Sequence, residues 1–322
     1  MSATSADLIH VWNRCHGCGA APIVGVRYEC QVCPAGPDND LCAACHALLA
    51  QGRLVHPKPG SRDLPPPPHP FKPFDGTPRE GAAPWLAVPW VQAAAPSVPE
   101  QCVVRPEFRS GQESYFGSYG FVVAAQYGGP PLLITALHVM DELIRAKRID
   151  ASAANKSYTG RELPEAVAEV QLYDAFAPNW MIAELGVARG MLTLADARMQ
   201  EPEPYSDRDI AAFRVMTKPP MRPLRLAAAP PPVGAPIFLA ASPGRGARER
   251  TVPAVVVEVS ERTFVFRFSP ANAMPPFASG APLIDRAGDV VAIMAGGGVL
   301  DGQQIGHANH VGNVRRHLGW RA

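Results

Sequence analysis

Three pairs of cysteines with the same spacing lie near the N-terminus and limit how that segment can fold. The pairs CHGC, CQVC and CAAC are formed by Cys15 and Cys18, Cys30 and Cys33, and Cys42 and Cys45. A Cys-x-x-Cys turn can aim two thiolates at one ion, and a structural zinc ion takes four Cys or His ligands. Two zinc ions therefore need two further ligands, and His46, His56 and His69 follow in the sequence. We expect two structural Zn2+ ions, whose binding would supply folding energy that so short a segment cannot obtain from an apolar core.

Composition and charge narrow the class of protein. The chain has 322 residues and a formal net charge of +1, which favours neither a nucleic-acid partner nor a membrane surface. It contains no apolar run of about 18 residues, so no transmembrane helix is expected. The N-terminus lacks a basic start followed by an apolar run, so no secretory signal is expected and the predicted location is cytoplasmic. Cysteines in that reducing compartment bind metals more often than they form disulfides. The alternative for the three Cys-x-x-Cys pairs is a disulfide scaffold or redox pairs.

Prolines are densest between His56 and Pro99 and include four in a row. Consecutive prolines favour polyproline II and cannot join a helix interior or a central strand. We predict a Pro-rich, semi-rigid linker over residues 72–100, between a metal-binding domain of residues 10–71 and a second domain of residues 101–322. The alternative is that part of this segment packs on a domain as ordered coil, because it contains Trp85 and Trp90.

From about residue 101 the pattern is typical of a mainly β protein. Short runs rich in Val, Ile and Phe are separated by Gly, Pro and Asp: YGFVVAAQ, PLLITAL, AEVQLYDAF, DIAAFRV, APIFLAAS, PAVVVEV and RTFVFRF. About 220 residues of short strands suit one barrel or a pair of barrels. We expect helical or irregular insertions over 141–156 and 181–200, and a helix in the last turn, HVGNVRRHLGW.

Three residues of this second domain have the types and the order of a catalytic triad. His138 follows the run LLITAL, Asp209 begins the run DIAAF, and Ser279 lies in a turn before APLID. Histidine can take the proton of a serine hydroxyl and return it to a leaving amine, and a buried aspartate orients the histidine. Each of these residues alone is more typical of a turn or a core. Asp207 is the alternative to Asp209 as the aspartate that orients the histidine.

The stretch CHGCGAAPIVGVRYECQVCPAGPDNDLCAACH resembles the ZZ-type zinc fingers, including its GVRYEC strand and the motif Asp38 to Cys42. The resemblance implies a small cross-braced module with two zinc ions. One ion would be held by Cys15, Cys18, Cys42 and Cys45, and the other by Cys30, Cys33, His56 and His69. His46 is the alternative to His69, because the proline-rich insertion makes the spacing between the last two histidines unusually long.

The ZZ resemblance also implies a protein partner. Members bind short protein segments, often a free N-terminus, and acidic residues at the positions of Asp38 and Asp40 contact the amino group. Two carboxylates on a concave surface favour an ammonium group. The alternative is that they cap the turn before LCAAC. A third acidic position of some members is His16 in this chain.

Residues 110–320 resemble the trypsin-like serine peptidases through the motifs TALHV, DIAAF and SGAPLID, the hairpin LIDRAGDVVAIMAGGG and the tail IGHANHVGNV. The resemblance implies two six-stranded antiparallel barrels of the chymotrypsin type with the site between them. His138 would be the general base and acid, Asp209 the orienting carboxylate and Ser279 the nucleophile. His307 and His310 could line the substrate pocket but are interpreted as structural, and Cys102 as a buried hydrophobic residue.

One residue departs from the family pattern. Phe277 stands where the family usually has glycine, and its N–H would form the oxyanion hole with that of Ser279. The resemblance also implies that Ala273, six residues before Ser279, is at the base of the specificity pocket, where an acidic residue would select Lys or Arg. With Ala273 there and small residues at Gly296 to Gly298, the resemblance implies a small or apolar side chain before the cleaved bond. We therefore expect a soluble serine endopeptidase acting on proteins or peptides recruited by the zinc module. The alternative, favoured by Phe277, is a non-catalytic adaptor whose two domains only bind proteins.

Overall fold

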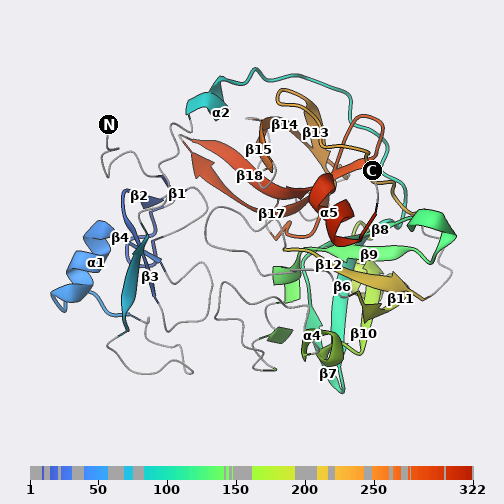
Figure 1. The fold of residues 1–322 in the computed structure, drawn as a ribbon, viewed down its shortest axis with the longest axis horizontal. Coiled ribbons are helices and arrows are strands. Elements are labelled where there is room, and N and C mark those ends of the chain that lie inside the picture. The colour runs from blue at the N-terminus through green and yellow to red at the C-terminus, as the bar shows by residue number, and fades with distance from the viewer. Residues whose placement is uncertain are drawn as a thin grey trace. The chain divides into compact units, whose positions relative to one another are not determined.

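The structure is a computed structural model in which the chain forms two compact units. One unit comprises residues 1–84 with 297–303, and the other comprises 85–296 with 304–322. The residues described are 9–10, 15–20, 23–30, 40–56, 69–74, 83–140, 143–144, 147, 162–192, 209–216, 222–242, 249–260, 264–269, 275, 277–300 and 302–320 (Figure 1). None of the helices in these ranges is long and apolar enough to cross a membrane.

The N-terminal unit is built on small antiparallel sheets. Its elements are β1 (Ile9–His10), β2 (Ile23–Val24), β3 (Arg27–Cys30), β4 (Asp40–Cys42), α1 (Ala43–Ala50) and β5 (Phe71–Phe74). β1 pairs with β2, and β3 lies between β4 and β5. Among the described residues of this unit, the buried apolar cluster includes Ile23 and Leu41 with two cysteines, Cys15 and Cys45. Two members of this cluster are therefore also members of the cysteine pairs that are expected to bind zinc.

The first barrel of the second unit is antiparallel. Its strands are β6 (Val103–Ser110), β7 (Glu113–Phe116), β8 (Gly120–Val123), β9 (Leu132–Thr135), β10 (Glu169–Asp174), β11 (Glu184–Met191) and β12 (Ala211–Val215). They follow the order β10-β11-β12-β9-β8-β6-β7, and pairing of β6 with β10 closes six of them into a barrel. Short helices between them are η2 (Gln126–Gly128), η3 (Leu137–Met140), α4 (Glu162–Ala166) and η4 (Trp180–Ile182).

The second barrel is closed by six strands in the order β13-β14-β15-β18-β17-β16. They are β13 (Pro236–Leu239), β14 (Val252–Val259), β15 (Phe264–Phe268), β16 (Pro282–Ile284), β17 (Val290–Leu300) and β18 (Gln303–His310). The predicted terminal helix follows as α5 (Val311–His317). Side chains of both barrels belong to one continuous apolar cluster, which includes Phe108 and Phe213 of the first barrel and Phe238 and Phe266 of the second. The predicted pair of antiparallel barrels is therefore confirmed.

One sequence-based expectation was wrong. Residues 181–200 were expected to be helical or irregular, but β11 occupies Glu184–Met191. Its sequence ELGVARGM has two glycines and no regular alternation, so the strand is not apparent locally. It forms because β10 and β12 offer it hydrogen-bonding partners on both sides. Of the other expected insertion, 141–156, only residues 143, 144 and 147 are described.

Residues from Trp85 onward, in the segment predicted as a linker, lie on the second barrel. Trp85, in α2 (Ala83–Ala87), is buried and its indole N–H donates to the carboxylate of Glu258 at 2.7 Å. The guanidinium of Arg267, on β15, donates to the backbone carbonyls of Trp85 at 3.0 Å, Leu86 at 2.6 Å and Val88 at 2.6 Å. These contacts fix where the chain enters the second unit.

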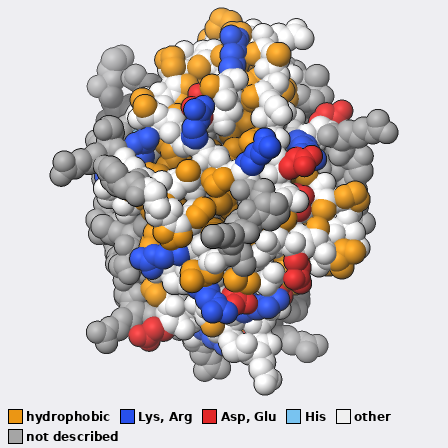
Figure 2. All heavy atoms as spheres, turned by 90° about the vertical axis from the view of Figure 1, so that its right-hand side faces the viewer, with side chains coloured by type: hydrophobic (Ala, Val, Ile, Leu, Met, Phe, Trp, Pro, Cys, Tyr) orange, Lys and Arg blue, Asp and Glu red, His pale blue; other side chains and the backbone are white. Residues whose placement is uncertain are grey.

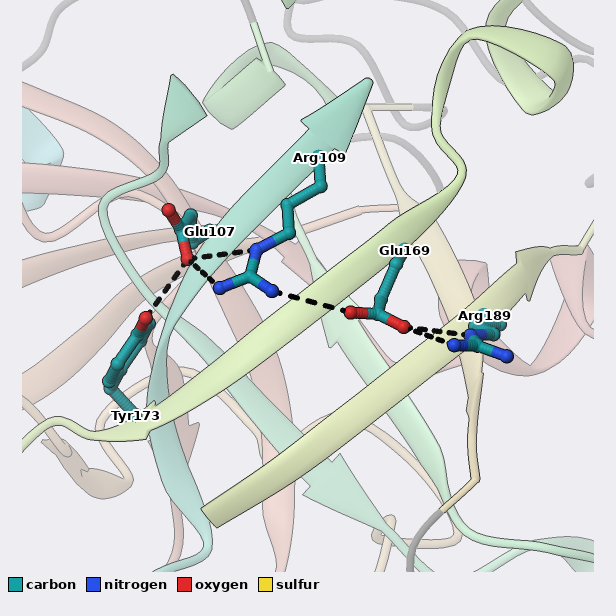
Figure 3. Close-up of polar contacts among 5 residues, drawn as sticks. All are labelled: Glu107, Arg109, Glu169, Tyr173 and Arg189. Carbon is teal, nitrogen blue, oxygen red and sulfur yellow. Dashed lines mark hydrogen bonds and ion pairs between the residues drawn. The ribbon is translucent and has the colours of Figure 1, made fainter. Parts of the chain in front are cut away.

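A polar network joins three neighbouring strands of the first barrel (Figure 3). Glu107 of β6 accepts hydrogen bonds from the Tyr173 hydroxyl at 2.9 Å and from Arg109 at 3.0 Å. Arg109 also pairs with Glu169 of β10 at 3.5 Å, and Glu169 accepts from Arg189 of β11 at 2.9 Å. Burial raises the pKa of Glu107, but the hydrogen bonds it accepts outweigh that effect and hold the pKa below its usual value. The network therefore supports the closure of the barrel at β6, β10 and β11.

Figure 2 shows one face of the molecule, where Lys and Arg side chains are interspersed with Asp and Glu side chains and with hydrophobic ones. On the described part of this face, no large area carries charge of one sign. This mixed pattern agrees with the formal net charge of +1.

Candidate active site and metal centres

Strand register in the first barrel places His138 and Asp209 at the same end of two paired strands. β9 ends at Thr135 and β12 begins at Ala211, and these two residues are directly paired. His138 lies three residues after the end of β9, in η3, and Asp209 lies two residues before the start of β12. An antiparallel pair brings the end of one strand to the start of the other, so the two side chains meet.

Asp209 holds His138 by two hydrogen bonds. Its Oδ2 lies 2.6 Å from Nδ1 of His138, and its Oδ1 accepts the backbone N–H of His138 at 2.8 Å. Asp209 is fully buried, and the Nδ2 of Asn309, on β18, donates to its backbone carbonyl at 3.0 Å. A neutral imidazole that donates from Nδ1 to a carboxylate has its basic lone pair on Nε2. The pair therefore has the arrangement needed for a general base; the rival Asp207 lies outside the described residues.

Ser279 lies in a turn of the second barrel that is docked on the first. The backbone N–H of Tyr119, just before β8, donates to the carbonyl of Ser279 at 3.0 Å, and the Thr135 hydroxyl donates to the carbonyl of Tyr119 at 2.6 Å. Gly280 has φ +81°, and a Cβ there would lie 2.1 Å from the Tyr119 oxygen and 2.5 Å from Thr135 Oγ1. Only glycine fits so close an approach in this conformation. The turn is thus held against the strand that precedes His138.

The hydroxyl of Ser279 is partly exposed and donates to the carbonyl of Ala295, on β17, over a long distance of 3.4 Å. Among the described residues, no hydrogen bond joins Ser279 to His138. Catalytic hydrogen bonds between a serine and a histidine are often formed fully only when substrate binds, so this geometry does not argue against a triad.

Phe277 has the backbone conformation that glycine usually provides. Its φ is +55°, in the left-handed region, and its side chain is 79% exposed. The neighbouring N–H groups of Gly280 and Ala281 donate to the carbonyls of Met294 and Ala278. Within the described part of the chain, the N–H groups of Phe277 and Ser279 donate to no acceptor. Two such donors near one turn can stabilise an oxyanion.

The first metal centre is formed by the sulfurs of Cys15, Cys18, Cys42 and Cys45, which all lie within 4.8 Å of one another. The Sγ atoms of Cys18 and Cys42 are 3.9 Å apart. Tetrahedral zinc with Zn–S bonds of about 2.3 Å separates its sulfurs by about 3.8 Å, so the spacing fits this ion. The backbone N–H of Cys42 also donates to Sγ of Cys15 at 3.3 Å.

Cys30, His56 and His69 form a second cluster, and all three residues are buried. Sγ of Cys30 lies 3.3 Å from Nδ1 of His69, close to the roughly 3.5 Å expected between a thiolate and an imidazole on one tetrahedral zinc ion. Burial, with smaller effects of neighbouring histidines, lowers the pKa of His56 to about 4, which favours the neutral form that binds metals. Cys33 lies outside the described residues. The alternative ligand His46 stacks instead on Tyr28, with ring centroids 3.8 Å apart.

Asp40 lies in a buried ion pair. Its carboxylate accepts a hydrogen bond from Arg27, on the adjacent strand β3, at 2.8 Å, and both side chains are almost fully buried. The ZZ resemblance implies that Asp40 contacts the amino group of a bound ligand. In the structure, the Asp40 carboxylate binds the guanidinium of Arg27. Asp38 lies outside the described residues, so its role stays a prediction.

Sequence reasoning did not single out four residues that position these sites: Tyr119, Thr135, Arg27 and Asn309. Thr135 lies in the motif TALHV, Arg27 in GVRYEC and Asn309 in IGHANHVGNV, so these three residues lie within recognised patterns. Their roles depend on partners that lie from 13 residues away, for Arg27 and Asp40, to 160 residues away, for Tyr119 and Ser279, and nothing in the local sequence identifies those partners.

Two family models match the chain. The model of the trypsin-like peptidase domain matches residues 117–293, more than half of the chain, and the model of the ZZ-type zinc finger matches residues 9–51. Among curated relatives, the chain is 45% identical over 51 residues to the auxin transport protein BIG of Oryza sativa subsp. japonica. It is 35% identical over 111 residues to the NBR1 homolog of Arabidopsis thaliana.

These matches with curated proteins cover short parts of them. The match to BIG covers 16% of this chain and 1% of that protein, and the match to the NBR1 homolog covers 33% of this chain and 14% of that protein.

Among solved structures, the active form of the Rv3671c protease of M. tuberculosis is similar with a TM-score of 0.41 and 18% identity. That similarity covers 72% of this chain and 92% of the other.

Proposed function

The chain belongs to the family of trypsin-like peptidase domains and carries an N-terminal ZZ-type zinc finger, and we propose that it is a serine endopeptidase. The observation that carries this proposal is the pair of hydrogen bonds between His138 and the fully buried Asp209. A buried carboxylate that grips both the ring and the backbone of a histidine fixes the tautomer and the orientation that a general base needs. Ser279 is the proposed nucleophile, because its turn is docked beside the strand that precedes His138.

In the proposed reaction, Ser279 Oγ attacks the carbonyl carbon of the peptide bond and passes its proton to Nε2 of His138. The carbonyl oxygen becomes an oxyanion that accepts hydrogen bonds from the N–H groups of Phe277 and Ser279. His138 then gives the proton to the leaving nitrogen, the C–N bond breaks and an acyl-enzyme remains. Water attacks the ester with His138 again as base, which releases the acid and restores the Ser279 hydroxyl. Asp209 stabilises the imidazolium in both halves of the reaction.

The left-handed backbone at Phe277 supports a working oxyanion site despite the side chain. A phenylalanine has the same backbone N–H as glycine, so the substitution keeps the donor, provided that the turn adopts the required conformation. Its φ of +55° lies in the left-handed region and costs about 1–2 kcal/mol in strain. Loss of one donor of an oxyanion hole typically lowers kcat about 100- to 1000-fold. The transition-state stabilisation that the Phe277 N–H would provide therefore exceeds the strain energy at this residue.

The zinc-binding unit supports a separate, recruiting role. We propose that its two ions are structural, since four cysteines surround one and Cys30, Cys33, His56 and His69 would complete the other, leaving no open position for water. When bound, the ions supply folding energy and no chemistry to the cleavage step. A tethered module that binds a protein partner raises the local concentration of substrate at the peptidase. Asp38 is the proposed contact for the amino group of such a partner.

The experiment that tests the peptidase proposal is cleavage of a mixed peptide library by the zinc-loaded protein. We expect wild-type protein to cut internal peptide bonds, and Ser279→Ala to lose the activity at least about 1000-fold. Ser110→Ala, a serine at the end of β6, is the matched control and should cut at the wild-type rate. Equal cleavage by Ser279→Ala would refute the assignment of the nucleophile. No cleavage by well-folded wild-type protein would instead favour the non-catalytic adaptor.

A second test separates the two units. Cys30→Ser removes a proposed ligand of the second zinc ion, so it should lower the zinc content and weaken binding of a protein partner. Cleavage of a short peptide should stay close to the wild-type rate, because none of the proposed catalytic groups lies in the N-terminal unit. Loss of peptide cleavage in a variant whose barrels remain folded would contradict the modular arrangement.

A further inference from the structure

The loop between β7 and β8 contacts the chain beside His138 and also binds Ser279. A Cβ on Gly117 would lie 2.5 Å from a side-chain carbon of the residue after His138, so the loop packs directly against η3. The carbonyl of Tyr119 accepts a hydrogen bond from the Thr135 hydroxyl, three residues before His138, at 2.6 Å. The N–H of Tyr119 donates to the carbonyl of Ser279 at 3.0 Å. The position of this loop therefore helps to set where Ser279 lies relative to His138.

Arg105, on β6, contacts the same peptide group that binds Ser279. Its Nη1 donates to the carbonyl of Ser118 at 2.8 Å. That carbonyl and the N–H of Tyr119 belong to one planar peptide group. Because the group is rigid, the hydrogen bond from the guanidinium fixes the direction in which the N–H points at Ser279. A charged donor also polarises the peptide group, which strengthens the hydrogen bond on its other side.

The peptide group that follows Ser279 is held at both of its ends. Its carbonyl accepts from Tyr119, and its N–H, which is that of Gly280, donates to the carbonyl of Met294 on β17 at 2.8 Å. The guanidinium of Arg105, two peptide groups and β17 thus form one series of hydrogen bonds, with Ser279 in the series. A change at the Arg105 end therefore reaches the backbone that carries the Ser279 hydroxyl.

Aromatic rings hold the guanidinium of Arg105 in place. Its Cζ lies 3.8 Å from the centroid of the Tyr119 ring and 5.7 Å from that of the Trp180 ring, both within the range of cation–π contacts. The Tyr119 side chain is itself buried, and its hydroxyl accepts the N–H of Ser242, from the second barrel, at 3.3 Å. In the part of the chain that the structure describes, no carboxylate forms an ion pair with Arg105. The guanidinium is therefore directed at the loop and not at an acidic side chain.

We propose that Arg105 is a positioning residue for the nucleophile, which it orients through the peptide group between Ser118 and Tyr119. This inference rests on the proposed peptidase function. Arg105 acts on where Ser279 lies relative to His138 and not on how substrate binds, so its loss lowers kcat and leaves KM nearly unchanged. A half-buried arginine that only stabilised the barrel would instead affect unfolding and leave kcat of the folded protein at its wild-type value.

The first test is the steady-state cleavage of one peptide by two variants. Arg105→Met removes the charge and the donor, and we expect kcat to fall about 10- to 100-fold with KM within about twofold, because a displacement of about 1 Å has this effect. Arg105→Lys keeps the charge but not the planar fork of donors, so its kcat should fall less, about three- to tenfold. It also serves alone if Arg105→Met does not fold. Wild-type kcat in either folded variant, or a rise confined to KM, would overturn the inference.

The matched control is Arg267→Met. Arg267 is also a buried arginine that donates to backbone carbonyls, but its acceptors lie in residues 85–88, where the chain enters the second unit. The folded variant should keep wild-type kcat and KM even where its free energy of unfolding is lowered. An equal fall of kcat in Arg267→Met and Arg105→Met would show a general effect of losing a buried arginine, and would also overturn the inference.

Hydrogen exchange measured by mass spectrometry separates this inference from the peptidase proposal. In Arg105→Met, peptides covering residues 117–122 and 278–282 should exchange about tenfold faster, whereas Arg267→Met should leave both at the wild-type rate. If wild-type protein cuts nothing but exchange rises in this way, the peptidase proposal fails and the role of Arg105 in holding the Ser279 turn stands. If wild-type protein cuts peptides and Arg105→Met changes neither kcat nor exchange, the inference is refuted and the peptidase proposal stands. A lower kcat without faster exchange would refute the route through this peptide group.

Discussion

Gly280→Ala is expected to destabilise the protein through a close contact at the turn that carries Ser279. A Cβ at this position would lie 2.1 Å from the Tyr119 oxygen and 2.5 Å from Thr135 Oγ1, distances that real Cβ atoms essentially never show. The left-handed φ of +81° adds about 1–2 kcal/mol of strain for alanine. Moving the turn away stretches two hydrogen bonds, from Thr135 to Tyr119 and from Tyr119 to Ser279, each worth about 1 kcal/mol. The expected total is about 3–4 kcal/mol.

Gly234→Ala is the matched control for the backbone strain. Gly234 has φ +85°, almost the same as Gly280, but a Cβ there meets no heavy atom within 4 Å. This variant should therefore lose only the strain energy, about 1–2 kcal/mol. The difference between the two variants, about 2 kcal/mol, isolates the contact between the turn and the first barrel.

Urea unfolding of both variants beside the wild type gives these free energies. Gly280→Ala should also lose peptide cleavage, because the displaced turn carries Ser279, whereas Gly234→Ala should keep it. If Gly280→Ala costs no more stability than Gly234→Ala, the turn that carries Ser279 is not held against Tyr119 and Thr135.

Three further predictions concern parts of the chain away from that turn. A zinc chelator should make residues 10–71 susceptible to limited proteolysis while the barrels resist it, as mapped by mass spectrometry; equal resistance of both units would contradict structural zinc. Arg27→Met should destabilise the N-terminal unit by about 3–5 kcal/mol in thermal unfolding, because the buried Asp40 carboxylate loses its ion pair with the guanidinium; a change below about 1 kcal/mol would refute this. Cys102 is fully buried, donates to the Pro99 carbonyl at 3.0 Å, and has its pKa raised by burial to about 12, so iodoacetamide at pH 8 should label it only in denaturant. Rapid labelling of the native protein would show that the site opens.

The parts of the fold that were predictable have local signals. The runs LLIT and FVFRF are apolar, short and rich in β-branched or aromatic residues, and each forms a strand, β9 and β15. The motifs TALHV and DIAAF placed His138 and Asp209 at strand ends, and the structure brings these side chains together. The spacing of the cysteine pairs is also a local signal, because two ligands three residues apart can reach one ion through the geometry of a single turn. It therefore identified a metal-binding unit.

The parts that were not predictable depend on partners far away in the chain. β11 is a strand because β10 and β12 flank it, although its own sequence has two glycines. Trp85 packs on the second barrel because Glu258, 173 residues later, accepts its N–H, and no local pattern carries that information. The same holds for Asp40, whose partner Arg27 lies on the adjacent strand.

The choice between His46 and His69 shows the same limit. Both histidines follow the cysteines, and the sequence leaves open whether the proline-rich insertion can return to the second cluster. In the structure, β5 pairs with β3, and the register joins Phe71 to Cys30. This pairing brings His69, two residues before Phe71, next to Cys30. A strand pairing across about 40 residues therefore favours His69 over His46 as the proposed ligand, which short-range spacing could not do.

The most direct test of the account is labelling with a fluorophosphonate probe, which reacts with serines activated as nucleophiles. Zinc-loaded wild-type protein should gain one adduct by intact mass, and peptide mapping should locate it on Ser279. Ser279→Ala should gain none, and Asp209→Asn should react more slowly by several orders of magnitude, because the His138 tautomer is no longer fixed. An adduct on another residue, or no adduct on well-folded wild-type protein, would contradict the assignment of Ser279 as the nucleophile of a serine peptidase.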